Sequence, residues 1–152
     1  MTLQQKVAEL ISRSTNIADL KNWRKNCVKN RAHDLAELAF RRLIEIGAQG
    51  EALPGTVEHD FWRSIISYEA LRTEEEGKTI RASRTREKLK RVTAIQMLSD
   101  LATSLSASDA FKKLVEKGLV DLTGEAIILR HSYAFESYVV EAAKKRLDGL
   151  NV

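Results

Sequence analysis

The spacing of apolar residues constrains this fold more than any other feature of the sequence. Apolar side chains recur at steps of three and four residues over long stretches, and the clearest series is Leu89, Val92, Ile95, Leu98, Leu101 and Leu105. Such a period places them on one face of an α-helix, whereas a half-buried strand would alternate. Helix breakers are scarce, since the 152 residues include one proline and seven glycines. We therefore predict an all-α fold.

Cap and turn residues divide this pattern into about six to eight helices within one domain, 1–152. The expected parts are a helical hairpin at 2–47, a loop at 48–56, long helices at 57–76 and 83–105, and C-terminal helices at 107–150. The expected N-caps include Thr2, Asn16, Thr56, Ser83, and Ser106 or Ser108. Residues 119–129 are ambiguous: they form either a small β-hairpin about Thr123 or one buried helical turn that Thr123 caps.

Cysteine usage and hydropathy exclude several classes of protein. Cys27 is the sole cysteine, so an intramolecular disulfide and a cysteine-based zinc cluster are both excluded. The opening MTLQQKVAEL lacks the apolar core of a signal peptide, and no run approaches the roughly 20 apolar residues of a membrane span. We expect a cytoplasmic chain that does not enter membranes.

Positive charge is concentrated in KTIRASRTREKLKR, residues 78–91, which we call the basic segment. It holds seven cations and one carboxylate, a net +6, while residues 1–77 and 92–152 each sum to −1. Its cations are Lys78, Arg81, Arg84, Arg86, Lys88, Lys90 and Arg91. In a helix that starts near Ser83, Arg84, Lys88 and Arg91 would share a face, and arginine suits bidentate contacts to phosphates or base edges. The basic segment is therefore a candidate nucleic-acid-binding surface.

A second stretch, KNWRKNCVKNR at residues 21–31, holds five cations and no acidic residue. Lys21, Lys25 and Lys29 repeat at four-residue steps and so share one helical face. If both stretches met in space, contacts to about 4–6 phosphates would give a slope of log affinity against log salt of about −4 to −5.

A structural interpretation of these charges is also open. Cations on amphipathic helices are commonly no more than a solvated face, and Glu74, Glu75 and Glu76 lie just before the basic segment. Pairs between these glutamates and the arginines would each contribute only about 0–1 kcal/mol, but together they would cancel the positive surface.

Candidate catalytic groups are few, and we assign no catalytic residue, metal ligand or cofactor. The three histidines are dispersed at His33, His59 and His131, and no phosphate-binding loop or HExxH motif is present. His33-Asp34 and His59-Asp60 suggest metal pairs, but adjacent residues on a helix point about 100° apart. Each pair alone is a poor chelator.

The sequence thus favours a non-catalytic nucleic-acid-binding or nucleoprotein-accessory module, with DNA preferred over RNA as its partner. The alternative is a helical adaptor that docks an acidic protein surface. A third hypothesis is a small metal-dependent hydrolase that uses the His-Asp pairs. A homo-oligomer is compatible with the sequence.

Overall fold

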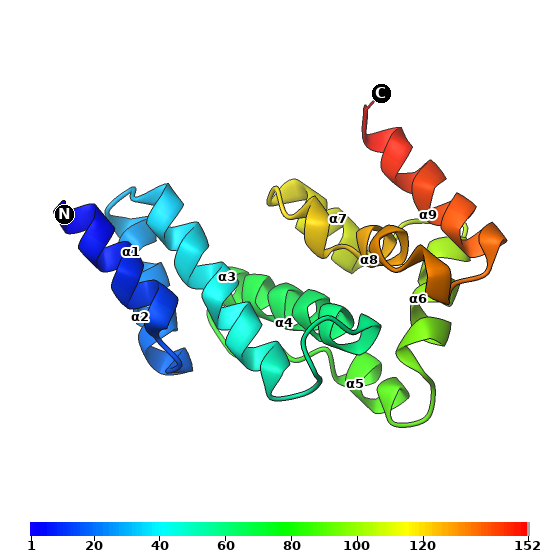
Figure 1. Cartoon of the computed structure of the whole chain (residues 1–152), viewed down its shortest axis with the longest axis horizontal. Helices are drawn as coiled ribbons and strands as arrows, with labels where there is room; N and C mark the ends of the chain where they lie inside the picture. Colours follow the sequence, from blue (N-terminus) through cyan, green and yellow to red (C-terminus); the bar gives the residue numbers. More distant parts are fainter. Residues whose placement is uncertain (152) are drawn as a thin grey trace. The chain divides into compact units, whose positions relative to one another are not determined.

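The regular structure of the protein is helical throughout the part that the structure describes. The computed structural model describes residues 1–151, the last of them by its backbone only. Within that range there are nine α-helices and three short 3-10 helices and no strand, which confirms the predicted all-α fold (Figure 1). The chain divides into two compact units, Met1–Glu51 and Ala52–Val152, with the boundary inside the predicted loop at 48–56.

The first unit contains three helices. They are α1 (Leu3–Arg13), α2 (Ile17–Lys29) and α3 (His33–Gln49). Thr2 caps α1 in a capping box with Gln5, and the side chain of Asn16 accepts a hydrogen bond from the backbone N–H of Asp19, as the cap residues predicted. Both α1 and α2 pack on α3, around a core of Ile11, Leu20, Ala39 and Leu43. Helix α3 continues through Gly47, so the predicted end of the hairpin at 47 is two residues too early.

The second unit contains the remaining elements. They are α4 (Val57–Glu76), α5 (Ser83–Leu89), α6 (Ala94–Thr103), α7 (Asp109–Glu116), η1 (Val120–Leu122), α8 (Gly124–Arg130), η2 (Ser132–Ala134), α9 (Ser137–Asp148) and η3 (Gly149–Asn151). Thr56 caps α4 and Ser108 caps α7 through their side-chain oxygens. Gly77 ends α4 in the left-handed conformation with φ 71°, which suits a residue without Cβ.

The core of the second unit lies where α4, α6, α8 and α9 meet. Helix α8 contacts each of the other three. Phe61, Leu98, Ile127 and Val139, one from each helix, are buried there. Burial of side chains of this size contributes about 1.5–3 kcal/mol each, so this cluster stabilises the packing of the four helices.

The helix predicted at 83–105 is not one helix, which corrects the sequence interpretation. Helix α5 ends at Leu89 and α6 begins at Ala94, where the side chain of Thr93 accepts a hydrogen bond from the backbone N–H of Gln96. Ser83 is the first residue of α5 rather than its cap. The cap at Thr93 satisfies backbone amides at the start of a new helix. This local hydrogen bonding favours a break between α5 and α6, even though the apolar spacing would allow one continuous helix.

The β-hairpin that was one alternative for 119–129 is absent, and this stretch is helical. Thr123 is fully buried between η1 and α8. Its hydroxyl donates to the carbonyl of Val120 at 2.7 Å and accepts from the N–H of Ala126 at 3.2 Å. Thr123 is thus the cap that the helical alternative required, and the Ile-Ile-Leu run belongs to α8.

Candidate functional site

The basic segment follows α4 directly, and two hydrogen bonds tie its first part to that helix. The backbone N–H of Ile80 donates to Oγ1 of Thr73 at 2.9 Å, and the N–H of Ala82 donates to Oε2 of Glu69 at 2.8 Å. These bonds satisfy backbone donors that lie outside a helix. Lys78 and Arg81 are therefore presented from a fixed connection between α4 and α5.

Arg86 differs from the other cations of the basic segment. Its Nε and Nη2 donate to the two carboxylate oxygens of Glu69 at 2.7 and 2.6 Å, and its guanidinium lies 5.0 Å from the centre of the Trp62 ring. The Glu69 side chain is 8% exposed and that of Arg86 24%. This bidentate pair joins α5 to α4, so we leave Arg86 out of the contact surface proposed below. Lys90 also has a partner, Glu87, at 3.2 Å on the surface.

The five other cations of the basic segment are exposed: Lys78, Arg81, Arg84, Lys88 and Arg91. None of them forms an ion pair with another side chain among residues 1–150. Arg84 and Lys88 lie one turn apart on α5. Arg91 does not continue that helical face as predicted, because α5 ends two residues before it.

Two of the three glutamates at the end of α4, Glu75 and Glu76, do not neutralise the arginines of the basic segment. Glu75 binds Lys113 at 2.8 Å and Glu76 lies 3.5 Å from Arg72. The hydrogen bond from Lys113 lowers the pKa of Glu75 and, reciprocally, raises the pKa of Lys113. Two of the three glutamates are thus directed to partners outside the basic segment.

In the first unit, Lys21, Lys25 and Lys29 are exposed on α2, and none of them forms an ion pair with a described side chain. Arg24, between them in sequence, turns inward instead. Its Nη1 donates to the carbonyl of Ala36 at 3.2 Å, and its guanidinium lies 4.7 Å from the centre of the Phe40 ring. The three lysines thus form a second cationic face.

Sequence reasoning missed a cavity in the second unit, which adjoins the basic segment. It has a volume of about 470 Å³ and is lined by residues of α4 to α8. Most of the lining is apolar, and it includes Phe61, Tyr68 and Phe111. Arg84, Thr85 and Lys88 of α5 contribute to the same lining. No sequence signal predicts such a cavity, because it depends on how five helices meet.

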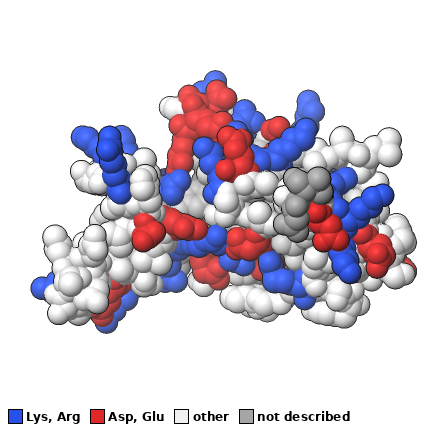
Figure 2. Space-filling model, turned by 90° about the horizontal axis from the view of Figure 1, so that it is seen from above, with Lys and Arg blue, Asp and Glu red and all other residues white. Residues whose placement is uncertain are grey.

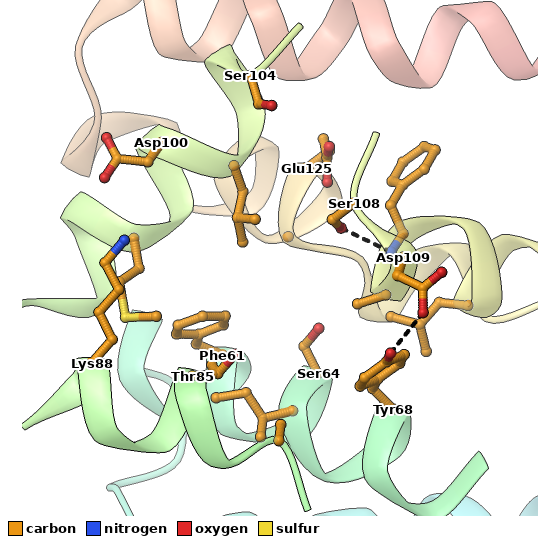
Figure 3. Close-up of a pocket in the computed structure, with 18 of the residues that line it drawn as sticks. Phe61, Ser64, Tyr68, Thr85, Lys88, Asp100, Ser104, Ser108, Asp109 and Glu125 are labelled. Atoms are coloured by element: carbon orange, nitrogen blue, oxygen red, sulfur yellow. Dashed lines mark hydrogen bonds between the residues drawn. The ribbon is translucent and has the colours of Figure 1, made fainter. Parts of the chain in front are cut away.

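Polar groups stand at both ends of this cavity. Figure 3 shows Lys88 and Asp100 at one end, and Ser108, Asp109 and Tyr68 at the other. The hydroxyl of Tyr68 donates to Oδ2 of Asp109 at 2.7 Å. Burial raises the pKa of Tyr68, and the hydrogen bond to Asp109 raises it further. The phenol therefore stays protonated and in place at neutral pH.

A buried charge in the lining of the cavity is neutralised within the fold. Glu125 of α8 is 3% exposed, and its Oε2 lies 2.9 Å from Nη1 of Arg146. The same guanidinium donates to the carbonyls of Leu101 and Ser104. Arg146 consequently fastens α9 to α6 and α8.

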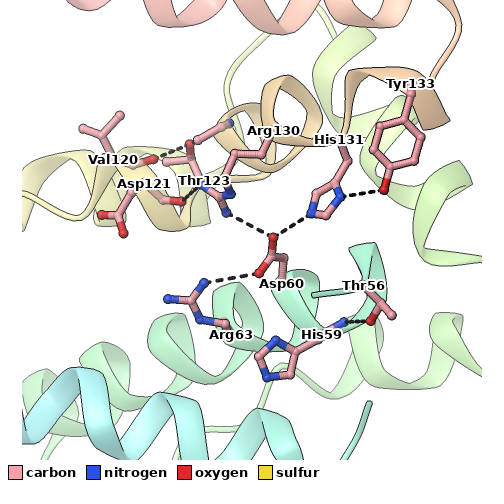
Figure 4. A network of polar contacts seen from close by, with 11 residues as sticks. Thr56, His59, Asp60, Arg63, Val120, Asp121, Thr123, Arg130, His131 and Tyr133 are labelled. Atoms are coloured by element: carbon pink, nitrogen blue, oxygen red, sulfur yellow. Dashed lines mark hydrogen bonds and ion pairs between the residues drawn. The ribbon is translucent and has the colours of Figure 1, made fainter. Parts of the chain in front are cut away.

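A second polar cluster surrounds Asp60 of α4 (Figure 4). Its Oδ2 lies 2.8 Å from Nε2 of His131 and 3.5 Å from Nη2 of Arg130, and its Oδ1 accepts from Arg63 at 3.2 Å. Because an ionised carboxylate only accepts, Nε2 of His131 carries the proton, and Nδ1 faces the hydroxyl of Tyr133 at 3.2 Å.

The surroundings of Asp60 keep it ionised. Burial alone would raise its pKa, but the hydrogen bond from His131 and the charges of Arg130 and Arg63 outweigh burial and lower the pKa below the ordinary 3.8. The cluster joins α4 to the end of α8 and to η2, and we interpret it as a structural tie. His131 and Tyr133 are neighbours in the sequence, but no sequence pattern predicted the contact of His131 with Asp60, which is 71 residues away.

The His-Asp pairs do not lead to a metal site. Among residues 1–150, no three histidine, cysteine, aspartate or glutamate side chains gather so as to hold a metal ion. Within the same range, no helix has the length and apolarity needed to cross a membrane.

Comparisons with protein-family models, with curated proteins and with solved structures yield no match to this chain. The candidate sites therefore rest on the residues and their geometry alone.

Proposed function

We propose that the protein is a non-catalytic nucleic-acid-binding module whose main contact surface is the basic segment. The observation that carries this proposal is the presence of five exposed cations that form no ion pair with a described side chain: Lys78, Arg81, Arg84, Lys88 and Arg91. A polyanion can neutralise these charges without first breaking contacts of the fold. Phosphate contacts of this kind dominate affinity for nucleic acids and carry little sequence information.

The cations of the basic segment attract a polyanion only over a short distance. On the face drawn in Figure 2, Lys and Arg side chains are interspersed with Asp and Glu side chains rather than gathered into one field. Because the screening length is about 8 Å at physiological salt, the neighbouring cations of the basic segment govern binding more than the net charge of +4 does. Contacts from five cations would give a salt slope of about −3.5 with single strands and about −4.5 with duplexes.

The test is fluorescence anisotropy of short single-stranded and duplex DNA across a salt series. The double variant Arg84→Gln/Lys88→Gln should bind more weakly and with a slope that is smaller by about 1.4 to 1.8. Its matched control is Lys144→Gln/Lys145→Gln, which removes the same charge from exposed positions on α9. Equal effects of the two double variants, or no salt-dependent binding by the unaltered protein, would contradict the proposal.

The helical adaptor with an acidic protein partner is the second candidate. It is supported by the apolar cavity beside Arg84 and Lys88. Exposure of Trp62 or Tyr68 would have supported it further, but both are only partly exposed, and they contact Arg86 and Asp109.

A further inference from the structure

The cavity of the second unit combines an apolar interior with cations at its wall, and the function proposed above leaves the interior unexplained. At about 470 Å³ it lies within the range of about 300–1,000 Å³ that holds small ligands in proteins. All its lining residues lie in the second unit. It is a concave site beside the exposed cations.

Aromatic side chains give this cavity a surface on which a flat group can stack. Phe61 and Phe111 are buried in its lining, whereas the ring of Tyr68 is partly exposed. Its hydroxyl is held by Asp109 at 2.7 Å and by Nη1 of Arg72 at 3.1 Å. The ring is therefore fixed in position before any ligand arrives.

The two cations at the wall can hold an anion that is joined to an apolar group, while each of the three carboxylates in the lining has a partner within the fold. Arg84 and Lys88 line the cavity from one face of α5, and neither forms an ion pair with another described side chain. Lys88 reaches the same end of the cavity as Asp100 in Figure 3. An anion held by Arg84 and Lys88 would leave the adjoining apolar group inside.

We propose, on the basis of the nucleic-acid function above, that the cavity receives one unstacked base of a single strand while Arg84 and Lys88 contact the flanking phosphates. In a duplex the base faces are covered by stacking and cannot enter a cavity. The negative charges of Asp100 and Asp109 disfavour the two closely spaced phosphate backbones of a duplex. Their carboxylates can also accept hydrogen bonds from the amino groups of an unstacked base. Stacking on aromatic side chains beside cations is the usual mode of single-strand binding.

The experiment compares a short single-stranded DNA of mixed sequence with an abasic strand of the same length, which keeps the phosphates and lacks the bases. Thr85→Trp, on the α5 wall, and Ala110→Phe, on α7, each fill the cavity. Ser137→Trp places the same bulk at an exposed position of α9 that does not line the cavity. Circular dichroism and the thermal midpoint identify any variant that does not fold.

The unaltered protein should bind the base-containing strand about tenfold more tightly than the abasic strand. The two filled variants should lose that preference yet keep their affinity for the abasic strand, and Ser137→Trp should retain the preference. Equal, salt-dependent binding of both strands by the unaltered protein would overturn the base site and leave the proposed nucleic-acid function standing. Binding of neither strand at low salt would overturn the proposed function as well.

Discussion

Asp60 shows how a single residue can link two elements that are far apart in sequence. Its carboxylate is in contact with His131, Arg130 and Arg63. These contacts lower the pKa of Asp60 in the folded state despite its burial. A carboxylate with a depressed folded pKa stabilises the fold fully above its unfolded pKa, and this contribution is lost as pH falls through the folded value.

We therefore expect the free energy of unfolding to decrease as pH falls below the ordinary Asp value of 3.8. Asp60→Asn should remove about 1–3 kcal/mol at neutral pH, because it leaves the donors around it without a charged acceptor. The variant should also show a weaker dependence of stability on acid. Urea unfolding between pH 7 and pH 3 measures both effects, with Asp148→Asn as an exposed control. Parallel pH profiles for the protein and Asp60→Asn would show that Asp60 does not contribute in this way.

At the scale of elements, helix α5 is held in place in an unusual way. It is seven residues long, has no side-chain N-cap and contains no buried residue. Isolated helices of this length are marginal in water. The pair between Arg86 and Glu69, together with the packing of Leu89 against the core, is what attaches it to α4.

Arg86→Lys should therefore destabilise the protein by about 1–2 kcal/mol, since lysine cannot reproduce two parallel hydrogen bonds to one carboxylate. Arg84→Lys, an equivalent change at an exposed position of the same helix, should stay within about 0.5 kcal/mol. Urea unfolding gives both values, and hydrogen exchange should show faster opening of the α5 amides only in Arg86→Lys. Similar stabilities of the two variants would mean that the Glu69 pair does not hold α5.

Cap residues explain which helices could be predicted from sequence and which could not. Thr2, Asn16, Thr56 and Ser108 mark helix starts because each accepts a local amide hydrogen bond, and such bonds depend only on neighbouring residues. The break before Thr93 was missed because the apolar period continues across it.

The features of the candidate site can likewise be separated into those that the sequence predicts and those that it does not. The concentration of cations in residues 78–91 is visible in the sequence, but the removal of Arg86 from the exposed set depends on Glu69, 17 residues away. The cavity was not predictable either, since residues as distant in sequence as Phe61 and Glu125 line it.

At the scale of the whole molecule, each of the two units carries an exposed cationic face. The second has the basic segment, and the first has Lys21, Lys25 and Lys29 on α2. If both faces contact one nucleic acid, the three lysines should contribute to the salt dependence of binding along with the basic segment.

The triple variant Lys21→Gln/Lys25→Gln/Lys29→Gln should then reduce the salt slope for a single strand by about 2. A control that removes the same charge from scattered exposed positions, Lys6→Gln/Lys112→Gln/Lys144→Gln, should change the slope much less. Anisotropy titrations across salt concentrations provide the comparison. If the α2 variant leaves the salt slope unaltered, the nucleic acid contacts the second unit only.

The hydrogen bonds that Ile80 and Ala82 donate to Thr73 and Glu69 affect the thermodynamics of any complex formed by the basic segment. A backbone that is already ordered loses little conformational entropy when a partner arrives. Association through this connection should accordingly show only a small change in heat capacity, unlike the large negative values of segments that fold as they bind. Isothermal calorimetry at several temperatures would reveal that preorganisation directly.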